Sequence, residues 1–101
     1  MNWVDLYDRL LPAKNWIVQN QLLDGSIPWD EKGKCDAWDH CECLISLAIY
    51  KEWEAFDKGV DWFFSNLNSQ GLIYSEFNNQ QPTLLNYQSH HAPYIALPLL
   101  Q

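Results

Sequence analysis

Basic residues are scarce in this chain, and none follows Lys58. Six Lys and Arg residues stand against 13 Asp and Glu residues, which gives a formal net charge of −7. After residue 58 the only charged side chains are Asp61 and Glu76. Because such a surface repels a phosphate backbone, the composition excludes a nucleic-acid-binding protein.

Long apolar runs and a basic N-terminal segment are also lacking. No run approaches the roughly 20 apolar residues that a membrane-spanning helix needs, so we expect no membrane span. Residues 1–5 contain no Lys or Arg ahead of an apolar core, so we expect no signal peptide. The odd number of cysteines (Cys35, Cys41 and Cys43) does not form a disulfide framework. We therefore expect a cytoplasmic protein with reduced thiols.

Apolar residues recur every three or four positions in four segments, and no segment alternates convincingly in the manner of a strand. We therefore predict an all-α fold with helices from Trp3 to the turn at 24–26, over residues 36–50, over 52–67, and from 85 toward the C-terminus. Pro12 is expected to kink or restart the first helix. The first and third helices are amphipathic, whereas the second and fourth are apolar on all sides, which is typical of buried helices. The chain is thus predicted to form two α/α hairpins, each with an outer and an inner helix.

An internal repeat matches these two hairpins. The segment from Trp16 to Gly25 aligns with the segment from Trp62 to Gly71 at a constant offset of 46 residues. We predict a single domain or a domain fragment in which repeat 1 covers about residues 1–50 and repeat 2 covers about residues 51–101.

The first repeat also resembles a known family pattern. Trp16, Gln21, Gly25 and Trp29 resemble the QW repeat of the terpenoid cyclase and protein prenyltransferase superfamily, and residues 24–42 are similar to bacterial prenyltransferase-like proteins of poorly defined function. The resemblance implies a partial α/α toroid, with inner and outer helices around a central cavity that holds an apolar or isoprenoid-like ligand. Such toroids normally have six hairpins, and this chain supplies two. We therefore expect a fragment of a longer protein or a homo-oligomer, and no enzymatic activity of this chain alone.

Candidate site residues follow from the same resemblance. The candidates for catalysis, expected near the polar end of the cavity, are Asp39, His40, Glu42, His90 and His91. The residues expected to line the ligand cavity are Trp38, His40, Tyr87 and His91.

The segment 35–43 contains the residue types that bind metals. On a helix, Asp36, His40 and Cys43 fall on one face, and an Asp/His/Cys set is a workable zinc site. No other cofactor is predicted. In the alternative interpretation, which we favour, Asp36 or Asp39 caps the helix, His40 forms a local hydrogen bond and the cysteines pack as small apolar side chains.

Two other functions stay open. A carbohydrate-active six-hairpin toroid would place Asp36, Asp39 or Glu42 beside a cleft lined by tryptophan. A non-catalytic helical-repeat module that binds a partner would bind no small molecule. The lack of Lys and Arg after Lys58 argues against a diphosphate ligand, which needs cations or a metal.

The six tryptophans divide by position. Trp29 and Trp38 flank the loop that leads into the second helix, where the mouth of a cavity is expected. The other four, on apolar stripes, are predicted to lie in the core: Trp3, Trp16, Trp53 and Trp62.

Overall fold

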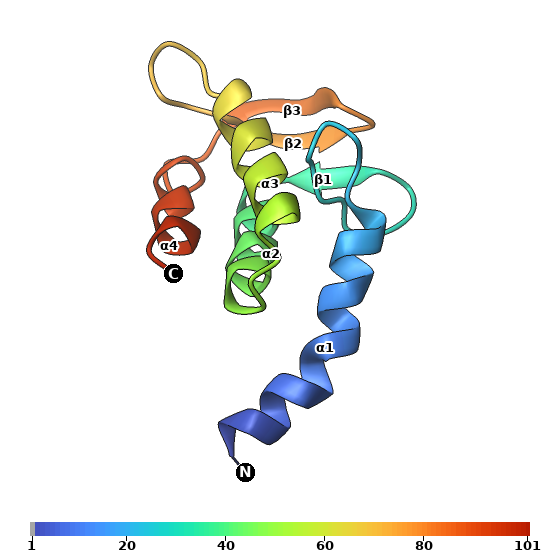
Figure 1. The fold of residues 1–101 in the computed structure, drawn as a ribbon. Helices are drawn as coiled ribbons and strands as arrows, with labels where there is room; N and C mark the ends of the chain where they lie inside the picture. Colours follow the sequence, from blue (N-terminus) through green and yellow to red (C-terminus); the bar gives the residue numbers. More distant parts are fainter. Residues whose placement is uncertain (1) are drawn as a thin grey trace.

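The computed structural model describes residues 2–101, which form four α-helices, a short 3-10 helix and one antiparallel sheet (Figure 1). The elements in chain order are α1 (Trp3–Asn20), β1 (Lys34–Asp36), α2 (Ala37–Ile49), α3 (Trp53–Ser65), β2 (Tyr74–Asn78), β3 (Gln81–Tyr87), η1 (Pro93–Ile95) and α4 (Ala96–Leu99). The three strands are ordered β1-β2-β3. Among the described residues, no helix is both long and apolar enough to cross a membrane.

The prediction of an all-α fold and an α/α toroid is therefore wrong, and the protein has an α+β fold. The segment between the predicted third and fourth helices contains β2, and the start of the predicted fourth helix belongs to β3. The two strands are joined by a two-residue turn in which Asn79 and Gln80 both have positive φ, the conformation that favours tight hairpins. Only the short η1 and α4 remain of the fourth helix.

The hydrophobic core surrounds α2, which packs alongside α3 and also contacts α4 and the strands β1 and β2 (Figure 1). Leu44 and Leu47 of α2 are fully buried, as is Phe63 of α3. Phe77 extends this core from β2, where burial alternates along the strand. The second helix is therefore not buried on all sides as predicted, because Leu44 and Leu47 are covered whereas Ile49 near its end is 51% exposed.

Two turns, one after α1 and one after α3, have the same backbone geometry. Gly25 donates a hydrogen bond to the Leu22 carbonyl, and Gly71 donates one to the Asn68 carbonyl. Each turn also has a hydrogen bond that spans its glycine, from Leu22 N–H to Ser26 O and from Asn68 N–H to Leu72 O. The two sets of donors and acceptors are 46 residues apart, the offset of the sequence repeat.

Helix α1 packs against the rest of the protein mainly through its C-terminal half. The helix continues through Pro12 and bends about halfway along its length (Figure 1). Its apolar stripe is mostly exposed, and Trp3 at its start is 84% exposed. Of the four tryptophans predicted in the core, only Trp62 is buried. Trp16 and Trp53 are, like Trp3, partly exposed to solvent. The sequence pattern identifies an apolar face but not the surface that covers it.

The ion pair between Lys14 and Glu52 fastens α1 to the start of α3. The Lys14 ammonium lies 2.6 Å from Glu52 Oε1, and the lysine is otherwise buried. We expect Lys14→Met to lower the free energy of unfolding by about 1 kcal/mol, since methionine keeps the apolar stem but removes a charge pair that is only partly exposed. Urea denaturation measures this loss, and hydrogen exchange should show faster exchange in α1.

The matched control is Lys58→Met. Lys58 pairs with Glu54 at 3.7 Å, and both side chains are well exposed, so this change should leave the urea midpoint nearly unchanged. Equal losses in the two variants would contradict the role assigned to Lys14.

Candidate functional site

A pocket of about 300 Å³ lies where β1 and β2 meet the start of α2 and the segment 88–91. We call it the polar pocket. Its lining residues are Trp29, Asp36, Trp38, Ser75, Glu76, Leu84, Gln88, His90 and His91.

Two carboxylates form one side of the polar pocket. Asp36 is the last residue of β1 and the N-cap of α2, and its side chain accepts a hydrogen bond of 2.6 Å from the Asp39 N–H. Glu76 lies opposite Asp36 in the β1–β2 register. The Glu76 carboxylate also pairs with Lys34 at 2.6 Å, and the Lys34 ammonium lies 4.6 Å from the centroid of the Trp29 ring. One lysine therefore links an acid and an aromatic ring of the same pocket.

Aromatic rings form the other side. The Trp38 ring centroid lies 4.8 Å from that of His90 and 6.4 Å from that of His91. His91 is only 4% exposed, and its Nδ1 has no hydrogen-bond partner among the described residues. Burial lowers the pKa of His91, and the neighbouring His90 lowers it further. The pocket is thus lined by a histidine whose buried Nδ1 has no hydrogen-bond partner among the described residues.

Asp39 lies in the first turn of α2, beside the polar pocket. The pKa of its carboxyl is raised, first by partial burial and then by the negative charges of Asp36 and Glu42. The Trp29 side chain partly offsets this shift.

His40 does not join the other predicted site residues, because both of its ring nitrogens already have partners in the core. Its Nδ1 accepts a hydrogen bond of 3.2 Å from the Ile27 N–H, so Nε2 carries the proton and donates to the Gly59 carbonyl at 2.8 Å. The ring is fully buried and packs against Trp62. Burial lowers the pKa of His40 to about 4. The side chain links α2 to α3 and to the loop that follows α1.

The residues proposed as zinc ligands have other roles in the structure. Asp36 caps α2, and His40 has no free nitrogen. Burial raises the pKa of the Cys43 thiol to about 11, which disfavours the thiolate that zinc binds. Within residues 2–101, no three His, Cys, Asp or Glu side chains are placed to hold a metal ion.

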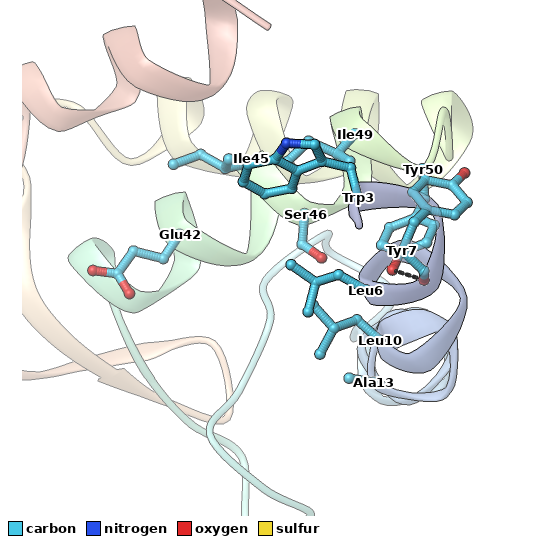
Figure 2. A pocket seen from close by; sticks show the side chains of 10 residues that line it. All are labelled: Trp3, Leu6, Tyr7, Leu10, Ala13, Glu42, Ile45, Ser46, Ile49 and Tyr50. Carbon is cyan, nitrogen blue, oxygen red and sulfur yellow. Dashed lines mark hydrogen bonds between the residues drawn. The ribbon is translucent and has the colours of Figure 1, made fainter. Parts of the chain in front are cut away.

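A second and larger hollow, of about 510 Å³, lies between α1 and α2 (Figure 2). We call it the apolar groove. Its lining residues are Trp3, Leu6, Tyr7, Leu10, Ala13, Glu42, Ile45, Ser46, Ile49 and Tyr50. The Tyr50 hydroxyl donates a hydrogen bond of 2.6 Å to the Tyr7 carbonyl, which joins the two helices at one end (Figure 2). Glu42 lies toward the other end, where its carboxylate accepts a 3.5 Å hydrogen bond from the Tyr94 hydroxyl.

The predicted site residues are therefore divided among several places. The polar pocket includes Asp36, Trp38, His90 and His91, and the apolar groove includes Glu42. Tyr87 lines neither of these hollows, because its ring stacks on Tyr74 at the edge of the sheet with centroids 5.0 Å apart. Sequence reasoning missed Glu76, although its isolation as the only charged residue after Asp61 was a usable signal.

The two hollows differ in the chemistry they offer. The polar pocket presents carboxylates, an imidazole and tryptophan faces, which suit a ligand with hydroxyl groups and an apolar face. The apolar groove presents hydrocarbon and aromatic surface with one carboxylate. No protein-family model matches the chain, and no curated protein is significantly similar to it.

Proposed function

We propose that this protein binds an elongated, uncharged apolar ligand of the isoprenoid type in the apolar groove. The observation that carries the proposal is the volume of the groove, about 510 Å³, together with its lining of tryptophan, leucine, isoleucine and tyrosine side chains. Small-molecule sites in proteins have similar volumes and a similar excess of apolar surface. The sequence resemblance to the terpenoid cyclase and prenyltransferase superfamily also favours an isoprenoid.

The charges around the groove favour a neutral head group. No lysine or arginine lines it, and Lys14, a buried cation on α1, is paired with Glu52. The one ionisable carboxyl group in the lining, Glu42, would repel a diphosphate. A hydroxyl group can instead donate a hydrogen bond to this carboxylate. The proposed ligand is therefore a prenyl alcohol rather than a prenyl diphosphate.

Apolar burial supplies the affinity. Trp3 and Leu10 both face the groove and are well exposed in the free protein, so a ligand that covers them removes apolar surface from water (Figure 2). Each Å² of such surface contributes about 25 cal/mol.

We expect Leu10→Asp to weaken the binding of farnesol at least about tenfold, because the new carboxylate loses its hydration when the ligand covers it. Isothermal titration calorimetry with farnesol and with farnesyl diphosphate makes the comparison. Leu23→Asp is the matched control, because Leu23 is 98% exposed and lies outside the groove. The proposal fails if the diphosphate binds as tightly as the alcohol, or if the two aspartate variants bind farnesol equally.

Besides a prenyl alcohol, a second copy of the chain is a candidate for covering the exposed apolar side chains of α1. The exposed side chains of Trp3 and Val4 continue the apolar surface beyond the groove, and such a surface is typical of an interface. Light scattering at increasing protein concentration detects self-association. If Leu10→Asp abolishes a dimer and farnesol has no effect on its formation, the groove serves association rather than ligand binding.

We further propose that the protein works in a reducing compartment such as the cytoplasm. Its three cysteines are free thiols in the described chain, and Cys35 and Cys41 are buried. Burial raises the pKa of both thiols, which keeps them protonated and unreactive.

A further inference from the structure

We propose that the polar pocket is a second, independent binding site, which takes a neutral sugar. The sugar would stack on Trp38 and bond through its hydroxyl groups to Asp36 and to the free Nδ1 of His91. This inference does not depend on the apolar groove, because none of the residues that line one hollow lines the other.

The unpartnered nitrogen of His91 favours a ligand in the polar pocket. The side chain is 4% exposed and lines the pocket, yet its Nδ1 has no hydrogen-bond partner among the described residues. A buried polar atom without a partner is destabilising, and native structures contain few of them. A ligand hydroxyl satisfies this nitrogen whether it carries a proton or not, because a hydroxyl both donates and accepts.

Two acidic residues face each other across β1 and β2 at the pocket. Asp36 and Glu76 are directly opposite in the β1–β2 register, where like charges are unfavourable. Lys34 compensates only one of them, through its ion pair with Glu76. The Asp36 carboxylate has a second oxygen beyond the one that caps α2, and a ligand hydroxyl can donate to it in a charge-assisted hydrogen bond. The same acids exclude an anionic ligand.

Two partly exposed tryptophans also line the pocket. Trp38 is 40% exposed and Trp29 is 46% exposed. The Trp38 ring offers a flat apolar face on which the C–H face of a sugar ring can pack. The Lys34 ammonium already lies over Trp29, so the protein itself occupies the position that a cationic ligand would take there. A volume of about 300 Å³ is at the lower end of the range for ligand pockets, which suits a mono- or disaccharide.

Ligand-observed NMR with a panel of neutral sugars tests the proposal on the full chain. The probes are glucose, galactose, mannose, xylose and N-acetylglucosamine, with cellobiose and maltose as disaccharides. We expect at least one of them to bind the unmodified protein. We expect Asp36→Asn to weaken that binding at least about tenfold without unfolding α2, because asparagine also caps helices.

His91→Phe separates a binding role from a structural one. Phenylalanine keeps the ring but removes the unpartnered nitrogen, so this variant should lose sugar binding at least about tenfold while its melting temperature stays equal or rises. A purely structural histidine would instead lower the melting temperature when replaced.

Trp38→Ala and Trp53→Ala form the matched pair for stacking. Trp53 has a similar exposure, 48%, and lies outside the pocket. We expect Trp38→Ala to abolish sugar binding and Trp53→Ala to retain it. The proposal is overturned if no sugar of the panel binds, or if His91→Phe or Trp38→Ala binds the sugar as well as the unmodified protein does. It is also overturned if tetramethylammonium, a cationic probe for the tryptophan rings, binds in place of the sugars.

Discussion

Replacing Gly25 with alanine is expected to destabilise the protein by about 3 kcal/mol or more. Gly25 has a φ of +97°, which an L-residue with a Cβ adopts only at a cost. The added Cβ would lie 2.7 Å from the Lys58 carbonyl carbon and closer still to its oxygen, so the loop after α1 would have to move away from α3. This movement would strain the Gln21 side chain, whose amide bonds to both the Gly25 and the Ala55 carbonyls. Urea denaturation measures the loss.

Gly71→Ala is the control that separates the cost of a positive φ in alanine from the cost of a steric contact. Gly71 has a φ of +76° in the corresponding turn, but no atom lies within 4 Å of the Cβ that alanine would add. We expect a loss of about 1 kcal/mol, which reflects conformation alone. If the free energy of unfolding falls by the same amount in the two variants, the close contact between the first turn and α3 does not contribute to stability. That result would contradict the prediction for Gly25.

The helices around the core could be predicted from the sequence. The expected ranges 36–50 and 52–67 lie close to the observed α2 (Ala37–Ile49) and α3 (Trp53–Ser65). Both segments are long enough to show a repeated apolar spacing, and Asp36 provides a recognisable N-cap. Hydrophobic spacing therefore determined these elements without knowledge of their neighbours.

The sheet could not be predicted in the same way. β1 has three residues, too few for an alternating pattern to be visible. β3 is exposed along its whole length, so its residues show no alternation between buried and exposed positions. Asn79 and Gln80 form the hairpin turn without a glycine, and the usual sequence signal for such a turn is therefore missing.

The candidate site was only partly predictable for a related reason. Trp29 and Trp38 lie near each other along the chain, and both line the polar pocket, which is not the central toroid cavity that the resemblance implies. Glu76 reaches the same pocket through the pairing of β1 with β2, a contact between segments far apart in sequence. The family resemblance groups His40 with the other candidate site residues, whereas its side chain points toward α3 and the loop after α1.

The stability of the protein should fall steeply as the pH decreases from about 6.5 to about 4, and His40 should account for most of this loss. Burial lowers the pKa of His40 to about 4, against 6.5 for the unperturbed group, while the Gly59 carbonyl and the Asp24 charge oppose the shift only in part. In this pH window the unfolded chain binds a proton at His40 and the folded protein does not. The proton therefore stabilises the unfolded state, and the loss reaches about 3 kcal/mol at the lower end of the window.

Replacing His40 with glutamine should remove this dependence. At pH 7 the variant should be less stable than the unmodified protein, because glutamine does not reproduce both hydrogen bonds to Ile27 and Gly59. Its deficit should shrink as the pH falls, since only the unmodified protein has the buried imidazole that must stay neutral. Urea denaturation at a series of pH values measures this difference, in which the contributions of His91 and Asp39 cancel because both proteins contain them. A deficit that stays constant from neutral to acidic pH would show that His40 takes up a proton as readily in the folded protein as in the unfolded chain, and the assigned hydrogen bonds would then be wrong.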